Sequence, residues 1–326
     1  MAKLTMVKAL NLALHEEMER DRDVVVIGED VGVDGGVFRV TEDLHRTFGG
    51  KRVIDSPLAE AAIIGASIGM ALYGLKPVCE IQFSGFAFQC FHQIENHAAR
   101  YRMRSQGRFA CQLVMRMPFG GGVRALEHHS ESEEQFYAHM PGLKMVVPSG
   151  PRNARALLAA AIRDPDPVVF FEHKGLYHAL REDVPDEPET MEIGRAHVVR
   201  EGHDLTLIAY GAMLRVAREA AEVLAQEDGA DVEVIDLLTV SPLDRSTLAA
   251  SVQKTGRAVV VHEAPRSFGP GAEIAASVME SAFLSLEAPI KRVTAYDVPF
   301  VGFAREKTNV PDVDRVVAAS RETLAY

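Results

Sequence analysis

The sequence predicts an α/β protein of two domains with largely parallel sheets. Its 326 residues are enough for about two domains, each with its own core. Short apolar runs typical of buried strands alternate with helical patterns along the whole chain, which favours parallel sheets. A polar segment with two prolines, residues 181–190, interrupts this alternation and is typical of an interdomain linker. We therefore expect domains at residues 1–185 and 190–326.

The first domain is expected to begin with a helix at residues 6–20, where apolar side chains recur at helical spacing. Strands are expected at short runs of β-branched and aromatic residues, and helices where apolar residues recur every three to four positions. The predicted order after the first helix is strand 24–27, helix 57–75, strand 76–81, helix 86–104, strand 112–117, helix 132–138, strand 144–148, helix 151–162 and strand 168–171.

The second domain repeats the alternation on a smaller scale. Apolar runs predict strands at 205–210, 232–237, 258–262 and 291–295. Helical patterns between them predict helices at 214–226, 246–255 and 271–284. The order is βαβαβαβ, which again predicts a parallel sheet.

Composition excludes several classes of protein. The net charge is −11 and no basic tract occurs, so binding to nucleic acid or to an anionic membrane surface is disfavoured. The longest apolar run, 61–75, is too short to span a bilayer, which needs about 20 residues. No signal peptide is evident at the N-terminus. Cys79, Cys90 and Cys111 lack the spacing of a zinc site and are expected to be buried thiols in a reducing cytoplasm.

Glu60 is the most informative residue, because it stands at the head of an otherwise apolar helix. Ser56 is a good N-cap and Pro57 suits the first helical position. The small and apolar residues that follow predict a buried helix. A carboxylate in such surroundings is desolvated and can hold or share a proton near neutral pH. The alternative is that Glu60 only complements the helix dipole.

Further polar side chains follow other predicted strands. Glu29 lies just beyond the first strand, where α/β proteins bind ligands. The glycines around it lack the spacing of a dinucleotide-binding loop. Gln82 and Phe86 lie beyond another strand, where an amide and a ring face can receive a flat heterocycle. An aromatic residue at such a position more often belongs to the core, which is the alternative for Phe86.

Two adjacent histidines, His128 and His129, follow a glycine-rich loop at 120–122. Imidazoles on a loop suit proton transfer near pH 7, although a solvated loop position is the alternative. Ser130 lacks the strand–turn–helix motif of a hydrolase nucleophile.

Taken together, six segments closely resemble the β subunit of the thiamin-diphosphate-dependent 2-oxo acid dehydrogenases, in order and over essentially the whole chain. The segments are Gly28-Glu-Asp-Val, Asp55-Ser-Pro-Leu-Ala-Glu, Glu80-Ile-Gln-Phe, His129-Ser-Glu-Ser, Pro141-Gly-Leu-Lys-Met-Val-Val-Pro and Asp166-Pro-Val-Val-Phe-Phe-Glu. Glu80-Ile-Gln-Phe and Tyr101-Arg-Met-Arg-Ser look closest to branched-chain enzymes. The resemblance implies a pyrimidine-binding thiamin-diphosphate domain followed by a transketolase C-terminal-like domain.

The resemblance also implies roles for single residues. Glu60 matches the glutamate that hydrogen-bonds a ring nitrogen of the aminopyrimidine and so activates the thiazolium carbon. Phe86 matches the aromatic residue packed on that ring and Gln82 its amide neighbour. Glu29 matches a carboxylate near Glu60, and Leu58 is counted with these cofactor-binding residues. The resemblance makes His129 the histidine that assists acyl transfer to the lipoyl group.

One absence is equally informative. Thiamin enzymes hold the diphosphate through Mg²⁺ at a Gly-Asp-Gly motif, which this sequence lacks. The resemblance therefore implies that a separate α subunit binds Mg²⁺ and the diphosphate of a shared thiamin diphosphate. A monovalent-cation site, for K⁺, is matched by Ala161, Asp164 and Asp166, although Asp166 replaces the usual Asn.

The resulting hypothesis is a cytoplasmic β subunit of an α2β2 2-oxo acid dehydrogenase. It decarboxylates a 2-oxo acid, with a branched-chain substrate favoured, and passes the acyl group to a lipoyl acyltransferase core. The alternatives are a pyruvate- or acetoin-type split thiamin enzyme and a non-catalytic assembly subunit of the same fold.

Overall fold

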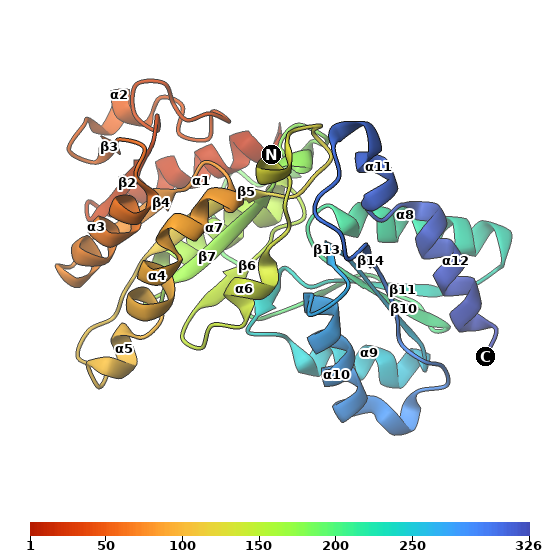
Figure 1. Ribbon diagram of the computed structural model, residues 1–326. Coiled ribbons are helices and arrows are strands. Elements are labelled where there is room, and N and C mark those ends of the chain that lie inside the picture. The colour runs from red at the N-terminus through yellow and green to blue at the C-terminus, as the bar shows by residue number, and fades with distance from the viewer. The chain divides into compact units, whose positions relative to one another are not determined.

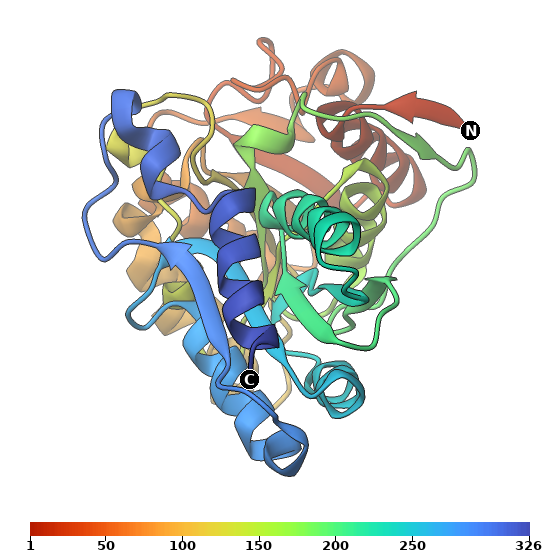
Figure 2. The same ribbon diagram turned by 90° about the vertical axis from the view of Figure 1, so that its right-hand side faces the viewer.

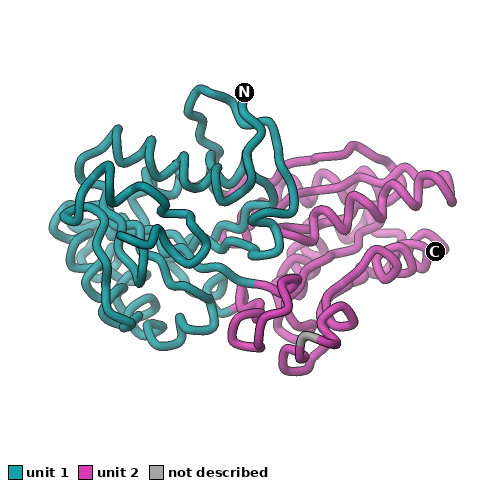
Figure 3. The backbone as a smooth tube through the Cα atoms, turned by 90° about the horizontal axis from the view of Figure 1, so that it is seen from above, with its two compact units in different colours: residues 1–119, 136–193 teal, residues 120–135, 194–326 magenta. Residues whose placement is uncertain are grey.

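The computed structural model describes residues 1–302 and 304–326 and divides them into two compact units (Figure 3). The first unit holds residues 1–119 and 136–193, and the second holds 120–135 and 194–326. Both are built from a largely parallel sheet and helices, so the predicted α/β class is confirmed. The domain limits drawn from the sequence, 1–185 and 190–326, stay a prediction. The units depart from them in the segment 120–135, which carries His129 and groups with the second unit.

The strands of the first unit lie side by side in the order β6-β7-β5-β4-β2-β3, and all are parallel. Gly28 at the end of β2 lies beside both Asp55 and Glu80, the last residues of β3 and β4. The carboxyl ends of these three strands therefore meet at one edge, where α/β sheets bind ligands. The strand bounds are β2 (Val24–Gly28), β3 (Val53–Asp55), β4 (Lys76–Glu80), β5 (Val114–Phe119), β6 (Lys144–Val146) and β7 (Val168–His173).

Two helices of the first unit confirm their predictions closely. α1 (Met6–Arg20) has the predicted limits, begins with Thr5 as its cap and packs against α7 (Pro151–Arg163).

β1 (Ala2–Leu4) was not predicted, nor was β8 (Glu182–Val184), which lies inside the proposed linker. They form an antiparallel pair beside the N-terminus (Figure 2). The short α2 (Leu44–Phe48) was also missed, because five residues give too little periodicity to detect.

The helix that carries Glu60 differs from its prediction in two respects. α3 (Glu60–Leu72) begins at Glu60 and not at Pro57. The N–H of Ser56 donates to the carbonyl of Gly28 at 2.8 Å, which keeps the preceding segment extended at the end of β2. The prediction of a fully buried helix is wrong for one face. Its isoleucines are buried, whereas four of its small residues, Ala62, Gly65, Ala66 and Gly69, are exposed.

The single helix predicted at 86–104 is also wrong. The segment consists of η1 (Ser84–Cys90), α4 (Phe91–Gln93), η2 (Ile94–Ala98) and α5 (Tyr101–Arg104). Its hydrogen bonds change from a three-residue step, Phe86 to Phe83, to a five-residue step, Ala99 to Ile94. Phenylalanine is a modest helix former. Here Phe88 and Phe91 pack edge-on against Phe136, so ring packing overrides regular helical spacing.

In the second unit the sheet has the order β14-β13-β10-β11-β9, with β9 antiparallel at one edge. β10 (Leu205–Ala209), β11 (Val232–Asp236), β13 (Ala258–Pro265) and β14 (Lys291–Ala295) confirm the four predicted strands, whereas β9 (His197–Arg200) and β12 (Thr239–Ser241) were missed. Figure 1 shows α8 (Met213–Glu227) and α12 (Val313–Leu324) on one side of this sheet, and α9 (Arg245–Thr255) and α10 (Pro270–Ala282) on the other. α12 was not predicted, nor was α11 (Glu306–Asn309).

Apolar side chains of α8, α12 and the strands form the core on one side of the second sheet. Leu207, Val234 and Val261 lie in it fully buried, with Leu224 and Val316 from the two helices. Among the residues that the structure describes, no helix is both long and apolar enough to cross a bilayer.

Candidate active site

Two carboxylates from different elements meet at the carboxyl edge of the first sheet. Glu29 follows β2 and Glu60 is the first residue of α3. Burial raises the pKa of Glu29, and the negative charges of Asp30 and Glu60 raise it further. Burial and the charge of Glu60 likewise raise the pKa of the Cys90 thiol to about 12. The charge of Glu60 therefore acts on both Glu29 and Cys90 of η1. The roles that the resemblance implies for Glu29 and Glu60 stay predictions.

Gln82 joins this pair from the neighbouring strand end. Its side-chain amide lies 3.5 Å from the carbonyl oxygen of Glu29 and 3.4 Å from a carboxylate oxygen of Asp30. The loop that carries both acids is itself tied to the sheet, because the N–H of Gly32 donates to Asp55 at 2.6 Å. The carboxylates of Glu29 and Asp30 are thus held on a short, anchored loop, and the Gln82 amide reaches this loop from the end of β4.

Phe86 supplies the aromatic surface expected beside these groups. It is half-buried on η1, its ring centroid lies 5.6 Å from that of Phe83, and the two rings meet edge to face. Phe83 in turn lies edge-on to Phe38, which packs on Tyr177. Leu58 is 71% exposed, so in this chain alone it presents an open apolar side chain.

A buried ion cluster lies at the same strand ends and was missed in the sequence. Arg116 on β5 donates to Glu172 on β7 at 2.6 and 2.7 Å and to Glu80 on β4 at 2.5 Å. The Tyr177 hydroxyl donates to Glu172 at 2.6 Å. Burial alone would lower the pKa of Arg116, but the two carboxylates outweigh it and raise that pKa. The signal that could have found the cluster was one charged residue within each of three apolar strand runs.

The two carboxylates of the segment 161–166 already accept hydrogen bonds from cationic side chains. Lys144 donates to both oxygens of Asp164 at 2.8 and 2.7 Å, and Arg102 donates to Asp166 at 2.5 Å. Ala161 is buried on α7. A monovalent-cation site here stays a prediction, and these two carboxylates would have to exchange protein cations for the ion. Among the described residues, no group of three or more His, Cys, Asp or Glu is placed to hold a metal ion.

His129 lies in the second unit, on the short turn η3 (Glu127–His129). It is half-buried, whereas His128 beside it is exposed. The residues that follow turn inward: Ser130 and Glu134 are fully buried. Tyr210 donates to Glu134 at 3.2 Å. His129 is thus placed at the end of an exposed loop whose return segment is buried in the second unit.

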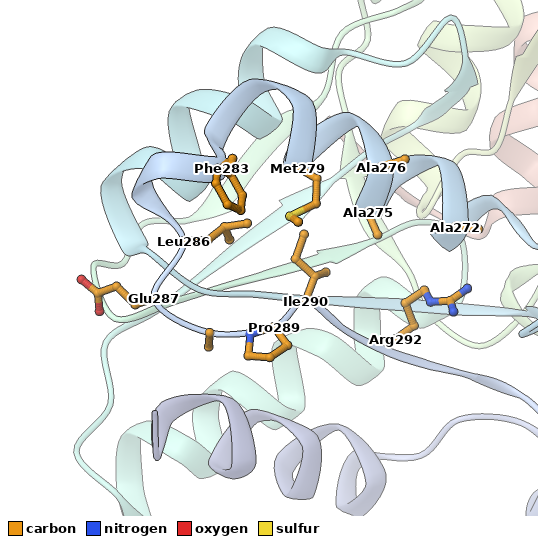
Figure 4. A pocket seen from close by; sticks show the side chains of 11 residues that line it. Ala272, Ala275, Ala276, Met279, Phe283, Leu286, Glu287, Pro289, Ile290 and Arg292 are labelled. Atoms are coloured by element: carbon orange, nitrogen blue, oxygen red, sulfur yellow. The ribbon is translucent and has the colours of Figure 1, made fainter.

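The second unit also has a groove of about 690 Å³ between α10 and β14. Figure 4 shows Met279, Leu286 and Ile290 in its apolar wall, with Glu287 and Arg292 at opposite ends. Glu287 is engaged by Arg257 at 2.7 Å. Neither a histidine nor a pair of carboxylates lines the groove, so it is not part of the candidate active site.

Comparisons with known proteins agree with this geometry. The family described as "Transketolase, pyrimidine binding domain" matches residues 2–179, and the family described as "Transketolase, C-terminal domain" matches residues 194–316. The pyruvate dehydrogenase E1 component subunit beta of Staphylococcus epidermidis is 50% identical over 326 residues, which is 100% of both chains. The same values hold for the protein of that name from Staphylococcus aureus strain Mu50. The chain belongs to the β-subunit family of the thiamin-diphosphate-dependent 2-oxo acid dehydrogenases.

The β-subunit family confirms the oxidoreductase class that the sequence predicted. The fold comparison agrees as well. A solved structure described as a split gene transketolase, inactive beta4 tetramer, superposes with a TM-score of 0.82 over 99% of both chains, at 23% identity. That likeness shows the fold alone. As a β subunit, the chain carries Glu29, Glu60, Gln82 and Phe86 in the part that matches the pyrimidine-binding domain.

Proposed function

We propose that this chain holds the aminopyrimidine half of thiamin diphosphate within an α2β2 2-oxo acid dehydrogenase. In the proposed reaction a 2-oxo acid loses CO₂ and the remaining acyl group passes to a lipoyl carrier. The observation that carries the proposal is that Glu29, whose pKa the charge of Glu60 helps to raise, lies with Gln82 at the carboxyl edge of the sheet, with Phe86 on the η1 segment that follows Gln82.

The residues present fit an aminopyrimidine. Such a ring is flat and has hydrogen-bonding nitrogens along its edge, and the site offers one aromatic face, one amide and two carboxylates. Burial and the negative charges of Asp30 and Glu60 raise the pKa of Glu29 above its ordinary value. When bound, thiamin diphosphate supplies the carbon centre that adds to the 2-oxo group and stabilises the charge left by departing CO₂.

In this mechanism each side chain has a defined task. Glu60 exchanges a proton between its carboxylate oxygen and a pyrimidine ring nitrogen, which is general acid–base chemistry. Phe86 fixes the plane of the ring, and Gln82 fixes the loop of Glu29 and limits how far that carboxyl can move. The anchoring of Gly32 on Asp55 keeps this set in place before any ligand arrives.

The exposed surface of the first unit supports a partner chain. Large apolar side chains at the two ends of α3 and on η1 are open to solvent, among them Leu58 at 71%, Tyr73 at 91% and Phe88 at 49%. Exposed apolar residues grouped beside a face of small residues, as on α3, are typical of a protein interface. An α subunit that supplies Mg²⁺ and the diphosphate contacts fits the absence of a Gly-Asp-Gly motif.

Pyruvate is the substrate we propose first, because it is named in the relatives that are 50% identical over the whole chain. A branched-chain 2-oxo acid is the second candidate, on the basis of the Tyr101-Arg-Met-Arg-Ser segment. Acyl transfer to the lipoyl group is assigned to His129, whose imidazole can donate and accept protons near neutral pH.

The substrate proposal is tested with the assembled enzyme of this chain and its cognate α chain. We expect kcat/KM for pyruvate to exceed that for 3-methyl-2-oxobutanoate by at least about 10-fold, because a pocket shaped for a methyl group resists added carbons. Rates of CO₂ release from the two acids under identical conditions give the ratio. A ratio in favour of the branched acid would instead assign the branched-chain type.

A further inference from the structure

We propose that Glu306 and Glu263 are positioning residues for His129. Both accept hydrogen bonds from the backbone of residues 120–129, here called the His129 loop. These bonds fix the position of the loop and therefore of the imidazole. The inference rests on the proposed role of His129 in acyl transfer, and it concerns residues of the second unit only.

Three hydrogen bonds, from the N–H groups of residues 121, 122 and 124, join the two carboxylates to the start of the loop. The N–H of Gly121 donates to Glu263, and the N–H of Gly122 donates to Glu306. The N–H of Arg124 donates to the second oxygen of Glu306 at 3.0 Å. Glu306 therefore uses both of its oxygens on one loop, as a carboxylate that closes a turn of backbone amides does.

The backbone of the loop is shaped to present these amides. Gly120 and Gly122 have φ angles of 81° and 87°, and Arg124 has a φ of 56°. The N–H of Gly120 donates to the carbonyl of Glu131 at 2.9 Å and closes the base of the loop. A Cβ atom added at Gly121 would lie 2.9 Å from both Glu306 and Phe300. The loop is therefore in close contact with the carboxylates of Glu263 and Glu306, here called the clamp.

Both carboxylates that contact the loop are buried. Glu263 is 5% exposed on β13 and Glu306 is 3% exposed at the start of α11. Burial and the charge of Glu263 raise the pKa of neighbouring Glu134 to about 8.

The tip of the loop is exposed to solvent. Val123 is 44% exposed and Leu126 is 65% exposed, so apolar burial contributes little at the tip. Segments with few buried side chains open locally at small cost unless their backbone hydrogen bonds hold them. A displacement of about 1 Å at a reacting group can cost about 10²-fold in rate.

The test uses the assembled enzyme with Glu306→Ala, and Glu222→Ala as the control at an exposed glutamate on α8. We expect Glu306→Ala to lower transfer to a lipoyl acceptor by about 10- to 100-fold. CO₂ release with an artificial electron acceptor should fall far less. Glu222→Ala should match the unmodified enzyme in both assays. Equal losses in both assays for Glu306→Ala would overturn the proposal, because the effect would then not act through His129.

A double-mutant cycle separates positioning from general damage. Because Glu306 acts through His129, adding Glu306→Ala to His129→Ala should cause no further loss of lipoyl transfer. A further loss of the full size would overturn the proposal. If His129→Ala alone left lipoyl transfer intact, the assigned role of His129 would be wrong. Physical measurements on the loop would still decide whether Glu306 and Glu263 hold the His129 loop in place.

Those measurements are amide hydrogen exchange and limited trypsin cleavage. In Glu306→Ala we expect faster exchange in a peptide spanning 120–129 and faster cleavage after exposed Arg124, with no change in a peptide spanning β10. Gly121→Ala should give the same pattern, since its new methyl group would push the loop off the clamp. Unchanged exchange and cleavage in both variants would show that the carboxylates do not hold the loop.

Discussion

Replacing Glu60 by glutamine should reduce decarboxylation by the assembled enzyme by about 10²- to 10⁴-fold, the usual contribution of a positioned acid–base group. The amide has nearly the same shape and keeps one acceptor oxygen, but it cannot exchange a proton with the pyrimidine. CO₂ release from the 2-oxo acid measures the effect. Because the step precedes acyl transfer, the loss should be the same with a lipoyl acceptor and with an artificial electron acceptor.

The matched control for this prediction is Glu19→Gln, at an exposed glutamate on α1. It should leave the rate unchanged. Glu29→Gln should lower the decarboxylation rate less than Glu60→Gln does. Glu29 influences the reaction only through its electrostatic effect on Glu60, whereas Glu60 exchanges the proton itself. A Glu60→Gln enzyme with more than about a tenth of normal activity would remove Glu60 from proton exchange.

The largest loss of stability is expected for Arg116→Met. Methionine approximates the length of the arginine stem but leaves Glu80 and Glu172 buried without their cation. Removing one partner of a buried ion pair typically costs about 3–5 kcal/mol. Urea unfolding of the chain should show this as a lower midpoint. The same urea series on the triple variant Arg116→Met, Glu80→Gln, Glu172→Gln should recover part of the loss.

Arg46→Met provides the matched control, because Arg46 pairs with Asp43 at 3.0 Å on the surface, with its side chain 78% exposed. An exposed pair contributes about 0–1 kcal/mol. If Arg116→Met and Arg46→Met shifted unfolding equally, the buried cluster would not stabilise the strand ends that carry the site.

Sequence alone predicted much of the architecture, and its errors have physical causes. The parallel strands of both sheets other than β3 were found because a strand buried on both faces is a continuous apolar run, as at 24–27 and 258–262. β3 was missed because it has only three residues, one of them exposed. The edge strand β9 was missed because its side chains are mostly exposed. α3 was taken as fully buried because a run of alanine, glycine and isoleucine does not show which face the isoleucines occupy.

The residues of the candidate site likewise divide into those that the sequence predicted and those that it missed. Glu29, Glu60 and Gln82 were predictable because the carboxyl ends of neighbouring parallel strands must meet at one edge. Arg116, Glu172 and Glu306 were missed because their partners lie far along the chain: 56 positions separate Arg116 from Glu172 and 184 separate Gly122 from Glu306. No local pattern encodes such contacts. They follow from strand order and from the grouping of the His129 loop with the second unit.

The central claim is that this chain carries only half of a cofactor site. Isothermal titration calorimetry with thiamin diphosphate and Mg²⁺ tests it most directly, on the chain alone, on its α chain alone and on the assembled complex. We predict weak binding by the chain alone, without Mg²⁺ dependence, and tight Mg²⁺-dependent binding by the complex. Tight, Mg²⁺-dependent binding by the isolated chain would contradict the account.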